Sequence, residues 1–392
     1  MRLLVCSHKE SWATEASPSG YATDGGFPLQ MRALASLFDE IVVCVPVVEC
    51  PDHSGEIPLS GPGLRVCPLP LPSGRGVWRK LLLPIWLARA LPRLAREMRR
   101  ANAVHVPIPS DVGTFGIALA HVMRRPLFVR HCGTWDRPRT RAERLWRGYM
   151  IRSNGGRRVM MVTGGGVEPP SGNPELEWIF STTLSADEVK AHATPRHLQP
   201  ERLRLVTVGR QVEAKGTARV IDALPVLRTS LPNVTLLVIG EGADLDRFRS
   251  LAIASGVDDL VTFAGRLDHP GVLRALDQCD LFVFPTTASE GFPKAPLEAM
   301  ACGLPVVASA VSVLPQLVAG AGVVLDDVEP AAVAAAILDI ARSPDRYAEL
   351  SRGATLMAAR YTLDAWTNVI AARLTERWGP LRRGEVRSVG PS

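Results

Sequence analysis

The chain has 392 residues, a length that predicts two or three domains with cores large enough to need no disulfide or metal. Apolar residues make up 46%, charged residues 21% and aromatic residues 6%, which excludes collagen, coiled-coil and disordered classes. Lysine and arginine total 45 against 39 acidic residues, giving a formal net charge of +6 and a pI of about 9.1. This balance favours anionic partners such as phosphates or anionic lipids.

The first half of the chain alternates short apolar runs with segments of helical periodicity. The expected strands are 2–7, 40–48, 103–108 and 126–131, and the expected helices are 28–38, 78–100 and 112–123. Such alternation is typical of βαβ units on a parallel sheet.

The second half repeats this pattern more regularly. Its expected strands are 203–209, 234–240, 260–265, 281–285, 305–309 and 322–327, and its expected helices are 217–230, 243–255, 270–277, 293–302 and 329–342. Several of these strands end in glycine, which places turns at the carboxyl edge of the sheet, where open α/β sheets bind ligands.

We therefore predict an α/β protein with two doubly wound, Rossmann-like domains. The first domain is expected at 1–185, a polar linker that contains proline at 186–202, and the second domain at 203–362. The remaining 363–392 begins with a helical segment that no strand follows.

The cysteines and the N-terminus bear on the compartment. Seven cysteines are odd in number, scattered and never spaced Cys-x-x-Cys, so we expect neither a disulfide framework nor a zinc site. The N-terminal apolar run is too short for a secretory signal peptide, and no stretch reaches the roughly 18 apolar residues of a membrane span. These features predict a cytoplasmic protein.

The most informative segment is 281–307. A buried strand ends at Pro285, a small polar loop carries Glu290 and Gly291, and a helix beginning near Pro293 carries Glu298. The two carboxylates are expected to face one cleft, beside helix amides whose dipole attracts an anionic or hydroxyl-rich ligand. Taken singly, Glu298 could merely complement the helix dipole and Glu290 could be a solvated loop acid, but the pair favours a ligand site.

A second segment, 208–216, follows the first strand of the second half. Arg210 and Lys215 leave this loop in an arrangement suited to holding one phosphate with a guanidinium fork and a point charge. The order of residues is not that of a Walker loop. Lys215 is one of only five lysines in the chain, which favours a function over the alternative of a solvated lysine at a helix start.

Two further features follow strands of the first half. Gly25 and Gly26 precede an amphipathic helix, so their backbone could approach a phosphate closely, although an ordinary loop is the alternative. His131 follows the strand 126–131, with Trp135 nearby, and a histidine there could bond a sugar hydroxyl or shuttle a proton.

At these residues the chain resembles the family 4 retaining glycosyltransferases of the GT-B fold. The resemblance is dense from about 203 to 326 and loose before that. It rests on two glutamates separated by seven residues before an Ala-Cys-Gly-x-Pro-Val run, and on the Gly-Arg…Lys-Gly loop that starts at Gly209. It implies an acceptor-binding first domain and a nucleotide-sugar-binding second domain facing a cleft, with the last helix crossing back to the first domain.

The resemblance also implies roles for the residues named above. Glu298 matches the residue that holds the ribose hydroxyls, and Glu290 the one beside the donor sugar. Arg210 and Lys215 match the pair that binds the diphosphate, and Gly209 is counted with the donor-binding residues.

Other positions match the family more loosely. The backbone amides of Gly291, Phe292 and Lys294 would lie against sugar hydroxyls or the diphosphate, Gly25 and Gly26 would close over the distal phosphate, His131 would lie near the reacting carbon, and Arg266 would lie near the base. The Asn-Gly-Val-Asp segment usual before the second domain is missing, so contacts from that region are left open.

Asp244 and Asp246 have the spacing with which many other glycosyltransferases hold a divalent metal. Here they open a helix, so we interpret them as capping and dipole-complementing residues. We expect no essential metal and no cofactor other than the nucleoside-diphosphate sugar itself.

The segment 75–100 combines eight basic residues with one acidic residue, two tryptophans and many leucines. It could be an amphipathic helix on an anionic membrane, or a core helix with a solvated basic face that Pro84 and Pro92 break. The membrane alternative favours a lipid-linked or envelope glycan acceptor and a place on the inner face of the cell membrane.

The expected function is sugar transfer from a nucleoside-diphosphate sugar, a reaction that uses two acids and two cations at one site. The resemblance implies that the configuration is retained. Another GT-B activity, such as an epimerase or a phosphorylase, and a non-catalytic partner protein are the alternatives. Nucleic acid binding is not expected, because no recognisable module surrounds the basic charge.

Overall fold

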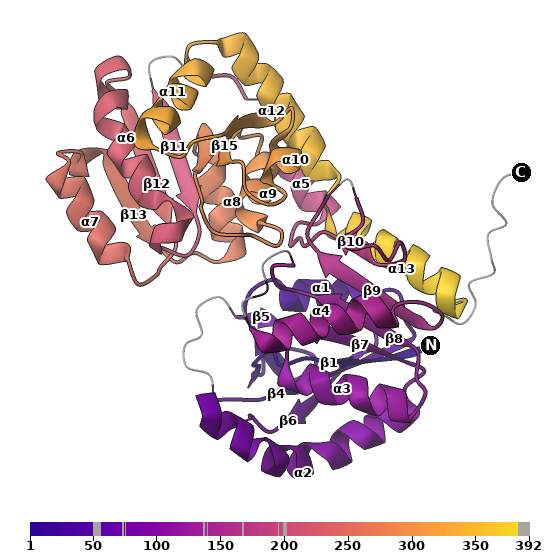
Figure 1. Ribbon diagram of the computed structural model, residues 1–392. Coiled ribbons are helices and arrows are strands. Elements are labelled where there is room, and N and C mark those ends of the chain that lie inside the picture. Colours follow the sequence, from indigo (N-terminus) through magenta and orange to yellow (C-terminus); the bar gives the residue numbers. More distant parts are fainter. Residues whose placement is uncertain are drawn as a thin grey trace, which may run out of the picture. The chain divides into compact units, whose positions relative to one another are not determined.

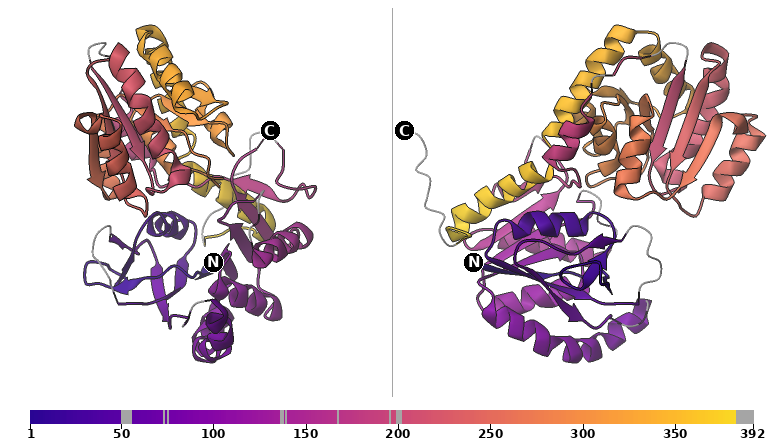
Figure 2. Two further views of the ribbon diagram at one scale, coloured as in Figure 1. Left: turned by 60° about the vertical axis from the view of Figure 1, so that its left-hand side comes forward. Right: turned by 180° about the vertical axis from the view of Figure 1, so that it is seen from behind.

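A computed structural model describes residues 1–49, 56–72, 74, 76–135, 138, 140–166, 168–194, 196–198 and 202–382 (Figures 1 and 2). The chain divides into two compact units. Unit 1 contains Met1–Thr183 together with the chain from Leu363 onward, and unit 2 contains Leu184–Thr362.

Unit 1 is built on a parallel sheet of seven strands in the order β10-β9-β8-β7-β1-β4-β6. The strands are β1 (Arg2–Cys6), β4 (Glu40–Pro46), β6 (Leu64–Leu69), β7 (Ala103–Ile108), β8 (Leu127–His131), β9 (Arg158–Thr163) and β10 (Glu177–Ile179). A small antiparallel sheet joins β2 (Trp12–Ala13), β3 (Tyr21–Thr23) and β5 (Ile57–Pro58).

Helices cover both faces of this sheet. They are α1 (Phe27–Ala35), α2 (Gly76–Arg100), α3 (Asp111–Val122), α4 (Arg141–Ser153) and α13 (Leu363–Trp378). Alternate residues of β1 point to opposite faces, so Leu4 packs in one buried cluster with α2 and α3, and Leu3 packs in the other with α1 and α13. Trp366 of α13 is fully buried there, which confirms that the last helix returns to the first domain.

Unit 2 has a parallel sheet of six strands in the order β13-β12-β11-β14-β15-β16. They are β11 (Leu203–Val208), β12 (Val234–Ile239), β13 (Val261–Gly265), β14 (Leu281–Phe284), β15 (Val306–Ser309) and β16 (Gly322–Leu325). The strand order reverses between β11 and β14. In open α/β sheets a ligand binds outside the carboxyl ends of the strands at such a reversal.

The helical segments of unit 2 complete a doubly wound layer structure. They are α5 (Ala186–His192), η1 (Glu213–Lys215), α6 (Thr217–Ser230), α7 (Leu245–Ala254), η2 (Asp258–Leu260), α8 (His269–Asp277), α9 (Lys294–Ala301), α10 (Leu314–Val318), α11 (Pro330–Ala341) and α12 (Pro344–Ala359). Apolar residues of α6, α7 and α11 form one buried cluster with the sheet, while α9 packs against β14, β15, α8 and α12.

Two expectations about helices differ from the structure. Pro84 and Pro92 do not break the basic helix, because α2 runs through both prolines. Both prolines are exposed, so the carbonyls that lose a hydrogen bond can be hydrated while the helix curves around the sheet (Figure 1). Residues 186–202, expected as a linker, include α5, which a capping box between Ser185 and Glu188 starts and which groups with unit 2.

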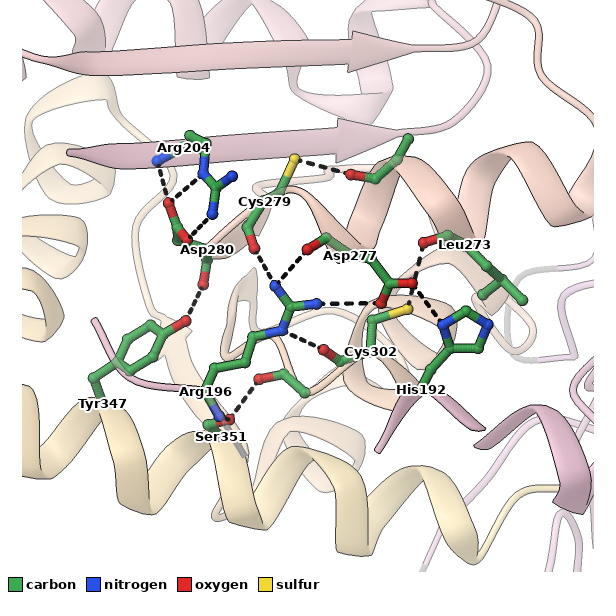
Figure 3. Close-up of polar contacts among 12 residues, drawn as sticks. His192, Arg196, Arg204, Leu273, Asp277, Cys279, Asp280, Cys302, Tyr347 and Ser351 are labelled. Atoms are coloured by element: carbon green, nitrogen blue, oxygen red, sulfur yellow. Dashed lines mark hydrogen bonds and ion pairs between the residues drawn. The ribbon is translucent and has the colours of Figure 1, made fainter. Parts of the chain in front are cut away.

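Arg196 follows α5 and ties together the carboxyl ends of α8 and α9 (Figure 3). Its guanidinium donates to the carbonyls of Cys302 (2.6 Å), Asp277 (2.9 Å) and Cys279 (2.6 Å). A cation is favourable at helix carboxyl ends, where carbonyls lack intrahelical partners. Arg196 therefore helps to hold α9, the helix that carries Glu298.

Candidate functional site

The loop after β11 is shaped by a glycine. Gly216 separates η1 from α6 and has a φ of 89°, in the left-handed region that favours glycine. A Cβ atom there would lie 2.3 Å from the carbonyl oxygen of Pro285, so a larger residue would push the loop away from the loop after β14. The glycine at 216 is thus explained by the close approach of two loops.

Hydrogen bonds join these two loops across the point where the strand order reverses. The hydroxyl of Thr286 donates to the carbonyl of Ala214 (2.9 Å), and the backbone N–H of Thr287 donates to the same oxygen (2.9 Å). The Nζ atom of Lys215 forms an ion pair with Glu290 and lies 5.5 Å from the ring centroid of Phe284. Two of the four expected side chains are therefore in direct contact.

Arg210 leaves the same loop with an exposed side chain. Beneath it, the buried Gln211 donates to the carbonyls of Gly209 (2.8 Å) and Ile239 (3.1 Å) and accepts from the hydroxyl of Thr217 (2.8 Å). Sequence analysis missed Gln211 and Thr217. They fix the backbone that presents Arg210. In the sequence, the one signal for this supporting role is a glutamine in the loop directly after the strand.

Glu298 lies on α9 and is 9% exposed. Its Oε1 atom is 3.3 Å from Nδ1 of His269, and Nε2 of His269 is 3.2 Å from Oε1 of Glu188. Glu188 also accepts hydrogen bonds from the backbone and hydroxyl of Ser185. This row of acid, imidazole and acid was not predicted, because its members come from three segments that the sequence does not relate.

Burial alone would lower the pKa of His269, but its contacts with the two carboxylates raise that pKa to about 9. Burial alone would raise the pKa of Glu188, but hydrogen bonds from His269 and Ser185 lower that pKa to about 2. His269 is therefore a cation near neutral pH, and its contact helps to orient the carboxylate of Glu298.

These contacts predict a loss of stability at high pH. Because the folded-state pKa of His269 lies above the unfolded value of about 6.5, the stabilisation is fully present below about pH 6.5. It is lost as the pH rises through about 9, and we expect the free energy of unfolding to fall by about 2 kcal/mol over that window.

Urea unfolding at several pH values measures this effect, with His269→Gln as the matched variant. The variant should lack this part of the pH dependence. Equal slopes for the wild type and the variant would contradict the assignment.

The remaining donor-binding candidates of unit 2 lie around the same loops. Gly291 and Phe292 follow Glu290, and Phe292 is buried with its ring centroid 5.3 Å from that of Tyr361. Lys294 is the first residue of α9, and Arg266 is an exposed residue directly after β13. Gly209 directly follows β11.

The expected role of Asp244 in capping α7 is wrong. The carboxylate makes no cap hydrogen bond to α7; it accepts one from the backbone N–H of Glu213 (2.7 Å), so it caps η1 in the loop of Lys215. Asp246 lies in the first turn of α7, where Arg249 contacts it at 3.0 Å.

In unit 1, Gly26 is the residue before α1 and Gly25 has a φ of 68°. The preceding Asp24 forms an ion pair with Lys9, which anchors this glycine loop near the end of β1. The amino-terminal end of α1 is partly buried, and the backbone amides beside this glycine loop are suited to an anion.

His131 ends β8 and is 2% exposed. Its ring packs edge-on against Trp135, with 5.3 Å between the ring centroids, and its Nδ1 accepts from the backbone N–H of Gly133 (3.3 Å). Burial lowers the pKa of His131, so the imidazole is neutral near pH 7.

Among the described residues, one cluster could offer three different metal-ligand atoms. Atoms of His192, Asp277 and Cys302 lie within 4.8 Å of one another (Figure 3). The Asp277 carboxylate already accepts from Nδ1 of His192 (2.7 Å) and contacts the guanidinium of Arg196 (3.3 Å). These contacts account for the cluster without a metal. Every described cysteine is a free thiol; Cys50 lies outside the described residues.

Comparison with known proteins bears directly on this site. Residues 191–357, which contain the loops of Lys215 and Glu290 as well as Glu298, match the model of the family described as glycosyl transferases group 1. This match covers less than half of the chain. The site residues of unit 2 therefore lie in the segment that matches this family model.

Two curated relatives match about half of the chain. One is the amylovoran biosynthesis glycosyltransferase AmsK of Erwinia amylovora, 30% identical over 51% of this chain and 47% of that protein. The other is a GDP-mannose-dependent alpha-(1-6)-phosphatidylinositol monomannoside mannosyltransferase of Mycolicibacterium smegmatis, 29% identical over 48% of this chain and 51% of that protein. The chain thus spans about half the length of the curated relatives it matches.

The likeness in structure covers nearly the whole chain. The crystal structure of Anabaena HepE in complex with UDP superimposes with a TM-score of 0.70 at 16% identity, covering 96% of this chain and 100% of that one. At this identity the likeness shows the fold alone, which is GT-B with two Rossmann-like α/β domains. No described helix combines the length and the apolar composition that crossing a bilayer requires.

Proposed function

We propose that this protein is a glycosyltransferase that moves a sugar from a nucleoside-diphosphate sugar to a glycan or lipid-linked acceptor in polysaccharide or envelope biosynthesis. The observation that carries the proposal is the contact between Lys215 and Glu290 at the reversal of strand order, inside the group 1 glycosyltransferase segment. In this proposal the second unit holds the donor and the first unit holds the acceptor.

The proposed chemistry follows from charge. Breaking the bond between the anomeric carbon and the diphosphate leaves negative charge on phosphate oxygens. Arg210 and Lys215 would neutralise that charge more strongly in the transition state than in the ground state, which is the condition for catalysis. The amides of Gly291, Phe292 and Lys294 would bind the sugar hydroxyls or the diphosphate, and Glu298 the ribose.

We further propose retention of configuration by attack on the face that the diphosphate leaves, as in family 4. A double displacement needs a carboxylate free to attack the anomeric carbon. Glu290 is the nearest candidate, but its carboxylate is engaged by Lys215 and its backbone N–H donates to Ser312 (3.2 Å). A phosphate oxygen would then take the acceptor proton.

Residues of unit 1 complete the proposal. Gly25 and Gly26 would close over the distal phosphate, and the neutral imidazole of His131 would bond a sugar hydroxyl near the reacting carbon. The base would lie near Arg266. No essential metal is proposed, since the cationic side chains can supply the charge that a metal supplies in other transferases.

The test is a thermal-shift screen with UDP-, GDP- and dTDP-sugars, followed by a product assay with the donor that binds. The names of the similar proteins mention different nucleotides, GDP-mannose for the mycobacterial enzyme and UDP for HepE. The screen therefore has to identify the base of the donor. A ligand that binds only the folded state raises the melting temperature. An isomerised donor, or a sugar phosphate formed with inorganic phosphate, would instead indicate an epimerase or a phosphorylase.

We also propose that α2 brings the protein to an anionic membrane from the cytoplasm, where a lipid-linked acceptor would be found. Trp86, Leu94 and Met98 of α2 are buried, so much of the helix serves the core. Its first turns nevertheless expose three apolar side chains with helical spacing, Trp78 (68%), Leu81 (62%) and Ile85 (58%). Exposed arginines continue along the helix, and this combination suits an interface of anionic lipid.

Vesicle sedimentation tests the role of α2. Replacing both Trp78 and Leu81 by serine should reduce binding to phosphatidylglycerol vesicles by about tenfold or more, since each exposed apolar side chain contributes on the order of 1.5 kcal/mol when buried. The matched control is the pair Val122→Ser and Leu145→Ser, exposed on other helices of the same unit. Unchanged binding in the α2 variant, or no binding by the wild type at low salt, would rule out this role.

A further inference from the structure

A pocket lies in unit 1, at the edge of the sheet where the strands begin. Its volume is about 390 Å³, within the size range of small-molecule sites. Asn102 precedes β7, Pro126 precedes β8 and Arg157 precedes β9, and all three line the pocket. Gly26 and His131 are placed after strands, at the carboxyl edge of the same sheet, so the pocket lies away from them.

The walls of this pocket are strongly basic. Four arginines line it, Arg124, Arg125, Arg157 and Arg382, and no acidic residue does. In the described part of the chain, none of these guanidinium groups forms an ion pair. The Arg125 side chain donates from Nη2 to the carbonyl of Arg99 (2.6 Å), and its Nε atom is buried without a hydrogen-bond partner. Four positive charges without counter-charges favour an anion between them.

The backbone of Arg124 adds an independent observation. This residue follows the carboxyl end of α3 with a φ of 52°, a conformation that glycine or asparagine usually adopts at a helix end. Its side chain is exposed and, among the described residues, forms no hydrogen bond or ion pair. An arginine that adopts a strained backbone conformation at the rim of a basic pocket indicates that its positive charge contributes to binding a ligand.

We propose that this pocket binds a ligand with two or more neighbouring phosphate groups, either a free phosphorylated molecule or the headgroup of a phospholipid. Guanidinium groups hold phosphates with paired, charge-assisted hydrogen bonds, and several of them can share one oligophosphate. A pocket of about 390 Å³ is much larger than a water molecule needs, and a ligand of several phosphate groups would use more of it than a single anion. This site is separate from the donor site proposed in unit 2.

Arg124→Gly is the most informative variant, because glycine removes the charge and relieves the strained backbone. It should melt at the same temperature as the wild type or above it. Arg157→Ala removes a second charge from an exposed loop position. Arg144→Ala, on the exposed face of α4, is the matched control, and Lys215→Ala controls for binding at the proposed donor site.

Inorganic triphosphate is the probe, and its binding is measured by calorimetry at low ionic strength. We expect the wild type, Arg144→Ala and Lys215→Ala to share a binding step that Arg124→Gly and Arg157→Ala each weaken by about tenfold or more. Added salt should weaken that step further. This result would indicate a free phosphorylated ligand.

A second arm measures sedimentation with phosphatidylglycerol vesicles. If triphosphate does not bind but the two pocket variants bind these vesicles at least tenfold more weakly than the wild type and Arg144→Ala, the ligand is a lipid headgroup. If both pocket variants stay folded and neither ligand distinguishes them from the wild type, the pocket is not an anion site and the proposal is overturned.

Discussion

Replacing Lys215 by alanine is expected to lower kcat by about 100-fold or more, which corresponds to roughly 3 kcal/mol of lost transition-state stabilisation. The amine contacts Glu290 and is proposed to face the departing diphosphate, so its loss removes positive charge where negative charge develops. Release of the nucleoside diphosphate under saturating donor measures the effect. The fold should be retained, because the side chain is partly exposed and few buried contacts are lost.

Lys190→Ala is the matched control, since this lysine lies exposed on α5 of the same unit. It should keep the activity of the wild type within about twofold. Lys215→Arg should recover part of the lost rate, because the charge returns with a different shape. A Lys215→Ala enzyme within threefold of the wild type would remove Lys215 from the proposed mechanism.

Replacing Glu298 by glutamine is expected to raise the dissociation constant for the nucleotide by about 10- to 100-fold, the usual effect of a lost hydrogen bond to a charged group. The carboxylate is proposed to bind both ribose hydroxyls, and His269 holds it in place at 3.3 Å. Calorimetry with the nucleoside diphosphate alone measures this, and kcat at saturating donor should change much less than KM.

The variant Glu188→Gln distinguishes nucleotide binding by Glu298 from its support of His269, because Glu188 contacts the other side of the same imidazole. It should lower the pKa of His269 and the stability at neutral pH while leaving nucleotide affinity within about threefold. Equal loss of affinity in both variants would mean that Glu298 acts only by supporting His269.

Sequence reasoning succeeded where local pattern and topology agree. The strands and helices expected between 203 and 342 have the observed bounds to within about two residues, because short apolar runs that end in glycine leave few alternatives. The short helix α10 in this range was not expected. The contact between Lys215 and Glu290 also follows from topology, since both loops leave the carboxyl ends of neighbouring strands.

Helices and strands without such glycine boundaries were not predicted. Helix α12 follows α11 after a single turn and has no strand to frame it, and β9 lies between a basic run and a glycine-rich segment that obscured its apolar residues. The row of Glu188, His269 and Glu298 could not be found from one sequence, because the position of α5 depends on packing and on the anchoring by Arg196.

The most direct test of the account is a crystal structure with a bound nucleoside-diphosphate sugar. The account predicts the diphosphate against Arg210 and Lys215, the sugar beside Glu290, and the ribose hydroxyls on the Glu298 carboxylate. A nucleotide bound with none of these four side chains in contact would contradict it.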